Sequence, residues 1–235
     1  MNMRSLALAL AASALLSPAA RAALRLSPDG KGHAVYVPYY TVEQGQTSLL
    51  TVSNSAPVTT AVQVLFAESD NGQNVMSFSM VLAPGATWSG AIVSDGEGAR
   101  LDTGSDVCTV PVLSTVDRRL RTFDYTSNYP DAGSAGRSRT RTGAVEVLEI
   151  GELRGPLATL ACGELSQALS SGWTPGVVSQ FRPPWGKVSA SIQVVQVAKG
   201  LIFQVPGIAL RGYSQGVLVG AGFGAVGATT DRTET

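Results

Sequence analysis

The sequence predicts a mainly β protein: an antiparallel β-sandwich, Ig-like or jelly-roll-like, with long loops and one short helix near 156–170. Three observations support this fold class. Short apolar runs recur roughly every ten residues with turn formers between them. Several of these runs alternate apolar and polar side chains, which is the pattern of a half-buried strand. The chain of 235 residues also holds 26 glycines and only 14% charged residues, which suits many short strands joined by turns.

The first half of the chain contains the clearest predicted strands. Residues 60–67 and 75–82 alternate, so that one face of each strand is apolar and the other is partly polar. Further strand-like runs lie at 33–40, 47–53 and 87–93, each bounded by Pro, Gly, Asn or Asp. We therefore expect residues 23–126 to form the core of the sandwich.

The second half is predicted to mix loops, strands and a helix. Residues 127–141 have no apolar periodicity and many turn formers, so we expect an exposed, flexible loop. Strands are predicted at 143–150, 188–197 and 200–210, and a helix at 156–170, where the apolar spacing is helical. Residues 142–235 thus supply further strands of the same sandwich or of a second β subdomain. The tail from about 212 is poorly defined.

The first 22 residues predict a secretory signal. Arg4 supplies a positive charge, the run 6–16 is apolar, and Ala20-Arg21-Ala22 has the small-x-small pattern of a cleavage site. The apolar run is too short for a membrane span, which needs about 20 residues. We expect cleavage before Ala23, no transmembrane segment after cleavage, and an exported protein located in the periplasm, at the cell surface or outside the cell.

The two cysteines, Cys108 and Cys162, both follow the predicted signal. Exported proteins reach compartments in which disulfides form. Only one intramolecular pairing exists for two cysteines, and the sequence has no C-x-x-C motif that would favour zinc or redox chemistry. We therefore predict a structural Cys108–Cys162 disulfide.

The composition also narrows the function classes. The formal net charge is zero, whereas a nucleic-acid binder needs a basic face. The single histidine, His33, leaves no material for a His-rich metal site. We expect no nucleic-acid partner, no cofactor and no bound metal.

Leu101-Asp102-Thr103-Gly104-Ser105 is the sharpest catalytic candidate. The string matches the catalytic loop of aspartic proteases, in which two neighbouring aspartates share a proton and act as acid and base. This chain has one such loop, so the chemistry would need a homodimer with Asp102 contributed by each copy. A Gly-containing turn in an acidic loop is the simpler interpretation.

Two further glycine motifs fit their families poorly. Gly212-Tyr213-Ser214-Gln215-Gly216 matches the G-x-S-x-G nucleophile elbow, but no histidine follows Ser214, and His33 lies at the opposite end of the chain. Residues 222–227 spell G-x-G-x-x-G, but the chain ends eight residues later, without room for a dinucleotide-binding unit. We interpret both as chance matches.

Three weaker binding hypotheses come from groups of like residues. Acidic loops offer oxygen ligands for calcium, arginine clusters offer an anion-binding surface, and scattered aromatic residues offer a carbohydrate site. In each case solvated turns, surface charge or core packing explains the residues equally simply. The groups are Asp95, Glu97, Asp102 and Asp106, or Asp70, Asn71 and Asn74; Arg118, Arg119, Arg121, Arg137, Arg139 and Arg141; and Tyr36, Tyr39, Tyr40, Trp88, Trp173 and Trp185.

Several separated segments resemble a known family. The stretch 23–53 contains Pro-Tyr-Tyr-Thr-Val and Leu-Leu-Thr-Val-Ser, and it is followed by the segments 78–92, 108–111 and 142–153. Over roughly 23–165 the chain resembles a family of uncharacterised exported β-rich proteins of Gram-negative bacteria. The resemblance implies a secreted β-rich protein and no particular activity.

The function that the sequence favours is that of an exported, non-enzymatic envelope or cell-surface protein. Its role would be structural or binding, with an unidentified envelope or surface partner. The alternative is the homodimeric aspartic protease that uses Asp102-Thr103-Gly104.

Overall fold

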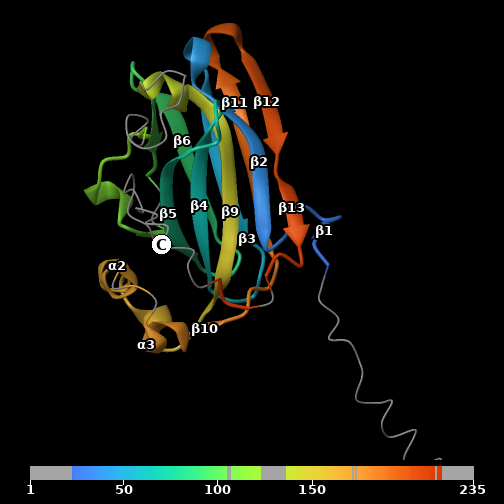
Figure 1. The fold of residues 1–235 in the computed structure, drawn as a ribbon, viewed down its shortest axis with the longest axis vertical. Helices are drawn as coiled ribbons and strands as arrows, with labels where there is room; N and C mark the ends of the chain where they lie inside the picture. The colour runs from blue at the N-terminus through green and yellow to red at the C-terminus, as the bar shows by residue number, and fades with distance from the viewer. Residues whose placement is uncertain are drawn as a thin grey trace, which may run out of the picture.

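Two antiparallel β-sheets pack face to face in the computed structural model (Figure 1), which confirms the predicted sandwich. The structure describes residues 23–104, 107–122, 136–170, 172, 174–214 and 216–218. The predicted signal 1–22, Asp106, the loop residues 127–135, Trp173 and the glycine motif 222–227 lie outside these residues. Within them, thirteen strands form one sheet of eight and one of five.

The eight-stranded sheet has the order β1-β13-β2-β9-β4-β5-β8, and β10 pairs with β9. Its strands are β1 (Arg25–Leu26), β2 (Ala34–Thr41), β4 (Thr60–Glu68), β5 (Asn74–Leu82), β8 (Cys108–Val110), β9 (Thr142–Leu153), β10 (Phe181–Arg182) and β13 (Ile208–Arg211). The five-stranded sheet has the order β12-β11-β3-β6-β7. Its strands are β3 (Thr47–Asn54), β6 (Thr87–Ser94), β7 (Ala99–Asp102), β11 (Val188–Gln196) and β12 (Leu201–Pro206).

The helices are short and lie in the connections. The predicted helix is present as the 3-10 turn η4 (Pro156–Thr159) followed by α2 (Cys162–Ser170), and α3 (Pro175–Val178) comes next. Thr174 caps α3 by accepting a hydrogen bond from the N–H of Val177. The other 3-10 turns are η1 (Glu43–Gly45), η2 (Leu113–Thr115), η3 (Arg137–Arg141) and η5 (Val197–Lys199).

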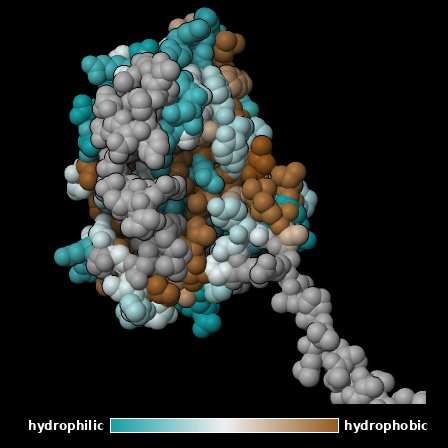
Figure 2. Space-filling model, in the orientation of Figure 1, coloured by the Kyte–Doolittle hydropathy of each residue, from teal (hydrophilic) through white to brown (hydrophobic). Residues whose placement is uncertain are grey.

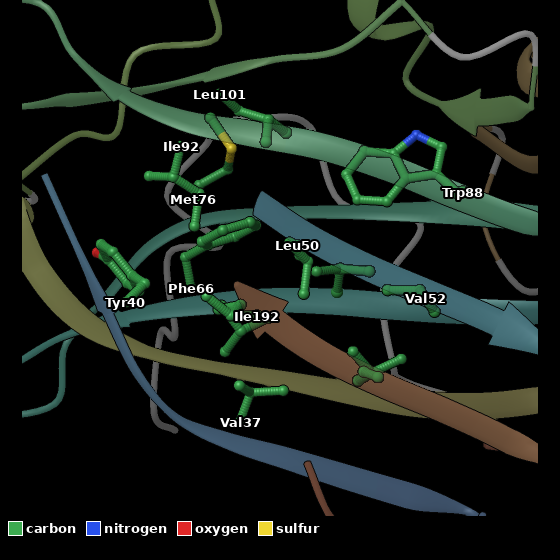
Figure 3. Packing of buried hydrophobic residues seen from close by; sticks show 14 of the residues in the cluster. Val37, Tyr40, Leu50, Val52, Phe66, Met76, Trp88, Ile92, Leu101 and Ile192 are labelled. Carbon is green, nitrogen blue, oxygen red and sulfur yellow. The ribbon is translucent and has the colours of Figure 1, made fainter. Parts of the chain in front are cut away.

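The main core lies between the sheets (Figure 3), where the inward-facing residues of the alternating strands meet. An aromatic chain runs through it, with ring centroids 6.1 Å apart for Tyr40 and Phe66, 6.3 Å for Phe66 and Phe78, and 5.6 Å for Phe78 and Trp88. Gly90 faces this core beside Trp88, where an added Cβ would overlap the indole ring. The alternation seen in the sequence thus sets the inward face of each strand.

A second apolar cluster lies beneath α2 and α3. Leu165 and Leu169 of α2 pack with Ile150 of β9 and Phe181 of β10. Cys108 of β8 and Cys162 of α2 form the predicted disulfide, with their Cα atoms 5.2 Å apart. The bridge therefore fastens the first turn of α2 to the edge strand β8.

The C-terminal strands belong to the same sandwich as the N-terminal ones. β9 lies between β2 and β4, so it pairs Val147 with both Val35 and Val64. β11 lies between β3 and β12 in the other sheet. Of the two arrangements left open for residues 142–235, the described residues adopt the single sandwich.

Two local expectations differ from the structure. The described part of the predicted flexible loop forms η3, in which Arg139 and Thr140 are buried because their polar groups find partners inside the fold. The predicted strand 200–210 is two strands, because the chain crosses from one sheet to the other at Gly207. An added Cβ at Gly207 would collide with the carbonyl of Ala190 and the side chain of Val35, so this crossing requires glycine.

Candidate functional site

Asp102 ends β7 and lines a shallow groove on the outer face of the five-stranded sheet. The groove has a volume of about 420 Å³. It is lined by outward-facing residues of neighbouring strands, which include Leu49, Thr51, Ser89 and Gln193. Alternation along β3, β6 and β11 turns these side chains away from the core.

The neighbours of the Asp102 carboxylate are cations. Arg100 donates two hydrogen bonds to it, at 3.1 and 2.9 Å, and the guanidinium of Arg118 lies 3.5 Å away. The loop is further held because Thr103 Oγ1 donates to the carbonyl of Ser89 at 3.1 Å. An aspartic protease places a second carboxylate beside the first so that the two share a proton. Among the described residues of this chain, arginines contact Asp102 instead.

The G-x-S-x-G serine and the single histidine share a second pocket, of about 350 Å³. Pairing of β13 with β2 brings Gly212 beside His33. From sequence order alone, these two residues were expected to lie far apart. The pocket is lined by Ala23, Arg25, His33, Pro184, Arg211, Gly212 and Ser214. The fold therefore places His33 and Ser214 around the same pocket, contrary to the expectation from sequence order. Their hydrogen bonds show whether they could act together.

His33 is bonded within the fold through one ring nitrogen. Nδ1 accepts from the N–H of Gly212 at 3.1 Å, and the backbone of Pro184 lies near the ring. Burial, with the nearby positive charge of Arg211, lowers the pKa of His33, although the backbone of Pro184 opposes this. A general base needs an open nitrogen within reach of the nucleophile. In the described residues, His33 Nδ1 bonds to the backbone that follows β13 rather than to Ser214.

Ser214 is likewise engaged in its own turn. Its Oγ donates to the carbonyl of Gly216 at 2.6 Å and accepts from the Gly216 N–H at 3.3 Å. Next to it, Arg211 binds both carboxylate oxygens of Asp29 at 2.7 Å. The hydrogen bond from Ser27 and this charge lower the pKa of Asp29 to about 2. The polar groups around this pocket serve to hold the chain ends of β1, β2 and β13 together.

Glu149 forms a buried anion site that sequence patterning missed. Glu149 lies in the predicted strand 143–150, and its side chain is buried. Its carboxylate accepts from the backbone N–H groups of Trp185 at 2.8 Å, Gly186 at 2.7 Å and Lys187 at 3.3 Å. Burial raises its pKa, and these three bonds partly offset the rise. The carboxylate anchors the loop before β11 to β9, and only the fold reveals this pairing.

The arginine clusters are engaged in ion pairs within the chain. The pairs are Arg118 with Asp102; Arg119 and Arg121 with Asp117; Arg137 with Asp95; Arg139 with Glu68; and Arg141 with Glu43. The pair between Arg139 and Glu68 is almost fully buried, with 1% and 0% of the side chains exposed. These contacts use the charge that would serve an anion-binding surface.

The acidic loops likewise bond inside the fold. Asp95 accepts from the N–H of Gly98 at 2.8 Å and pairs with Arg137, and Asp70 lies 3.4 Å from Arg139. In the described ranges of the chain, no group of three or more His, Cys, Asp or Glu residues is placed to hold a metal ion.

The aromatic residues proposed for a carbohydrate site are dispersed. Tyr40 and Trp88 are in the core, whereas Tyr36, Tyr39 and Trp185 are exposed. The indole N–H of Trp185 donates to Glu152 at 3.1 Å. Burial of two members of the set excludes them from a shared surface.

One edge of the sandwich carries an uncovered apolar surface, which sequence reasoning did not identify. Along β12, Leu201, Ile202 and Phe203 are 56%, 63% and 48% exposed. Figure 2 shows apolar surface gathered on the edge that carries β12, β13 and β1. We call the set Leu26, Tyr36, Leu201, Ile202, Phe203 and Ile208 the apolar edge. Large exposed apolar side chains gathered on one edge are a feature of interaction sites in soluble proteins.

Comparison of the chain with protein-family models, curated proteins and solved structures found no match. The resemblance to exported β-rich proteins therefore stays a prediction. No helix in the described part of the chain has the length and hydropathy needed to cross a membrane.

Proposed function

We propose that this protein is an exported, non-enzymatic β-sandwich module of the periplasm, cell surface or medium, and that it acts by binding protein through the apolar edge. The observation that carries the proposal is a contrast between two sets of groups. The candidate catalytic groups Asp102, His33 and Ser214 are engaged in hydrogen bonds within the chain. The large apolar side chains of the edge are about half exposed, and burying them in a partner would be favourable.

Export is supported by the predicted signal in 1–22 and by the Cys108–Cys162 disulfide. The test is expression of the full chain in a Gram-negative host, followed by fractionation and intact-mass analysis. We expect a chain that begins at Ala23, outside the cytoplasm, with both thiols blocked to alkylating reagents. An uncleaved cytoplasmic chain with two reactive thiols would refute export.

Binding through the edge is tested by placing a photo-crosslinking amino acid at position 202 in living cells. The control position is 49, on the outer face of the same sheet, where Leu49 is 38% exposed but lies on a central strand. We expect adducts at position 202 and few at position 49. Absence of adducts at position 202, in cells that contain the folded protein, would overturn the proposed binding function.

The alternative function is a homodimeric aspartic protease, and one observation favours it: Asp102, Thr103 and Gly104 line an open groove. The test is cleavage of an unfolded protein substrate at acid pH by the mature protein. The protease hypothesis requires pepstatin-sensitive cleavage that is abolished in Asp102→Asn. Because arginines surround Asp102, we expect no cleavage by either protein.

A further inference from the structure

The outer backbone edge of β12 is unpaired. β12 ends the five-stranded sheet and bonds only to β11. Gly207 N–H donates to the carbonyl of Ala190, and hydrogen-bonding direction alternates along an antiparallel strand. Residues 205, 203 and 201 therefore bond to β11, whereas Ile202 and Gln204 direct their N–H and C=O groups away from the sheet. Among the described residues, nothing pairs with these groups.

The side chains of β12 also expose an incomplete core. Val205 packs into the core between the sheets, so Phe203 and Leu201 lie on the same face of the strand. Both are nevertheless about half exposed, because the opposite sheet does not cover this end of β12. Natural edge strands are usually protected by charges, bulges or proline. Residues 201–205 of β12 have none of these, and Pro206 alone limits the strand at its end.

We propose that β12 pairs antiparallel with β12 of a second copy of this chain, with Phe203 on the two-fold axis. The inference rests on the proposed binding function and names the partner of the apolar edge. In this register Ile202 of each copy faces Gln204 of the other, so both outward N–H groups of each strand meet a carbonyl. Moving the axis to Gln204 would place Pro206, which has no N–H, opposite Ile202. That register leaves the Ile202 carbonyl without a donor, whereas the axis at Phe203 gives every outward N–H and C=O group of residues 202 and 204 a partner.

Self-pairing is favoured by charge and by area. β12 has no charged residue, so two antiparallel copies bring no like charges opposite one another. The half-exposed Leu, Ile, Phe and Tyr side chains of the apolar edge offer roughly 100 Å² each. The six together offer roughly 600 Å², about three quarters of the roughly 800 Å² per partner of a standard interface. A closed two-fold contact also removes both exposed edges at once.

The test is sedimentation velocity of the mature chain, residues 23–235, over a range of concentrations. The variants are Gln204→Pro, which removes an outward donor without touching the bonds to β11, and Ile202→Lys. Leu49→Lys is the matched control on the same face of the sheet. Thermal unfolding of each variant reports whether the fold is kept.

We expect a dimer in the wild type and in Leu49→Lys. The dimer dissociation constant should be at least about tenfold higher in Gln204→Pro and Ile202→Lys, because each variant acts twice in a symmetric contact. A wild-type monomer at every concentration would overturn the inference. So would a dimer dissociation constant that is unchanged in both variants when both are folded. An adduct at position 202 whose mass identifies another protein would also overturn it while leaving the proposed binding function intact. If one variant unfolds, the other decides the result.

Discussion

His33 shows at the scale of a single residue how a titratable group becomes part of the framework. Its Nδ1 accepts from the N–H of Gly212, so it links the beginning of β2 to the end of β13. Gly186 packs so closely against the ring that an added Cβ would lie 3.0 Å from it. Protonation at Nδ1 would make that nitrogen a donor, and it would then face the N–H donor of Gly212 without an acceptor between them. The cross-link therefore depends on the neutral ring.

We predict that His33 makes the protein less stable as the pH falls below about 6.5. The folded protein holds the pKa of His33 below its ordinary value, chiefly through burial. Above 6.5 both states carry a neutral ring, and the contribution is fully present. Below 6.5 the unfolded chain binds a proton that the folded chain rejects, so stability is lost until the folded pKa is reached.

The measurement is urea unfolding of the wild type and His33→Gln at pH values on both sides of 6.5. Carboxylates such as Glu149, whose pKa burial raises, titrate in both proteins and cancel in the comparison. The stability difference between wild type and variant should shrink as the pH falls. A difference that is constant with pH would contradict the role assigned to the neutral ring.

A second prediction at this scale concerns Arg139 and Glu68. Burial raises the pKa of Glu68. Hydrogen bonds from the N–H groups of Asp70, Gln73 and Asn71 and from Arg139 lower that pKa by more than burial raises it, so the net shift is downward. Arg139→Ala leaves this buried carboxylate without its counter-charge and should cost about 3–5 kcal/mol in unfolding free energy.

Two controls separate burial from charge in that experiment. Arg100→Ala removes a half-exposed arginine from its pair with Asp102 and should cost about 1 kcal/mol or less. Glu68→Gln combined with Arg139→Met should be less destabilised than Arg139→Ala alone, because no unpaired charge remains. The measurement is chemical denaturation. If Arg139→Ala and Arg100→Ala lower the unfolding free energy equally, the buried pair stabilises the protein no more than the exposed pair does.

At the scale of elements, the disulfide fixes α2 to the sandwich. Cys108 and Cys162 are 54 residues apart in the chain, and closing such a loop is worth about 4 kcal/mol in the chain-entropy model. Cys108→Ser combined with Cys162→Ser should lower the unfolding free energy by about that amount. The wild type should lose a similar amount on reduction, and the variant should not respond to the reductant. A reductant effect on the variant would point to a different cause.

Strand positions were largely predictable, whereas the contacts between strands were not. Alternation located strands such as Thr60–Glu68 and Asn74–Leu82 to within a residue or two, because burial of one face imposes the period of two. The break at Gly207 was missed because residues 200–210 read as one apolar run, and only the crossing between sheets requires glycine there. Local patterning reports burial and says little about which strand becomes a neighbour.

The same limit explains the candidate sites. Asp102, His33 and Ser214 were identified as reactive residue types, but their partners Arg118, Gly212 and Gly216 are set by pairing and turns. Arg139 was assigned to an exposed loop because nothing near it in sequence suggests burial, and its partner Glu68 is 71 residues away. The apolar edge escaped prediction for a related reason, since Leu201 and Phe203 have the pattern of ordinary core residues.

For the whole molecule, the order of strands makes the two halves of the chain interdependent. β9 from the second half separates β2 from β4 in one sheet, and β11 pairs with β3 in the other. Without β9 the eight-stranded sheet would split into two pieces, each with new unpaired edges and uncovered core residues. The N-terminal strands therefore cannot satisfy their backbone groups alone.

We predict that a fragment of residues 23–126 does not fold by itself. It lacks Val145 and Val147 of β9 and Ile192 of β11, which are fully buried in the main core. Their loss removes several large apolar contacts, each worth about 2–5 kcal/mol, against a total stability of about 5–15 kcal/mol for a typical domain. Amide proton NMR spectra of the fragment should show narrow dispersion, whereas residues 23–235 should give the wide dispersion of a folded β protein. A well-dispersed spectrum from the fragment would mean that the first five long strands form a domain of their own, and that β9 and β11 add to a sandwich already able to stand without them.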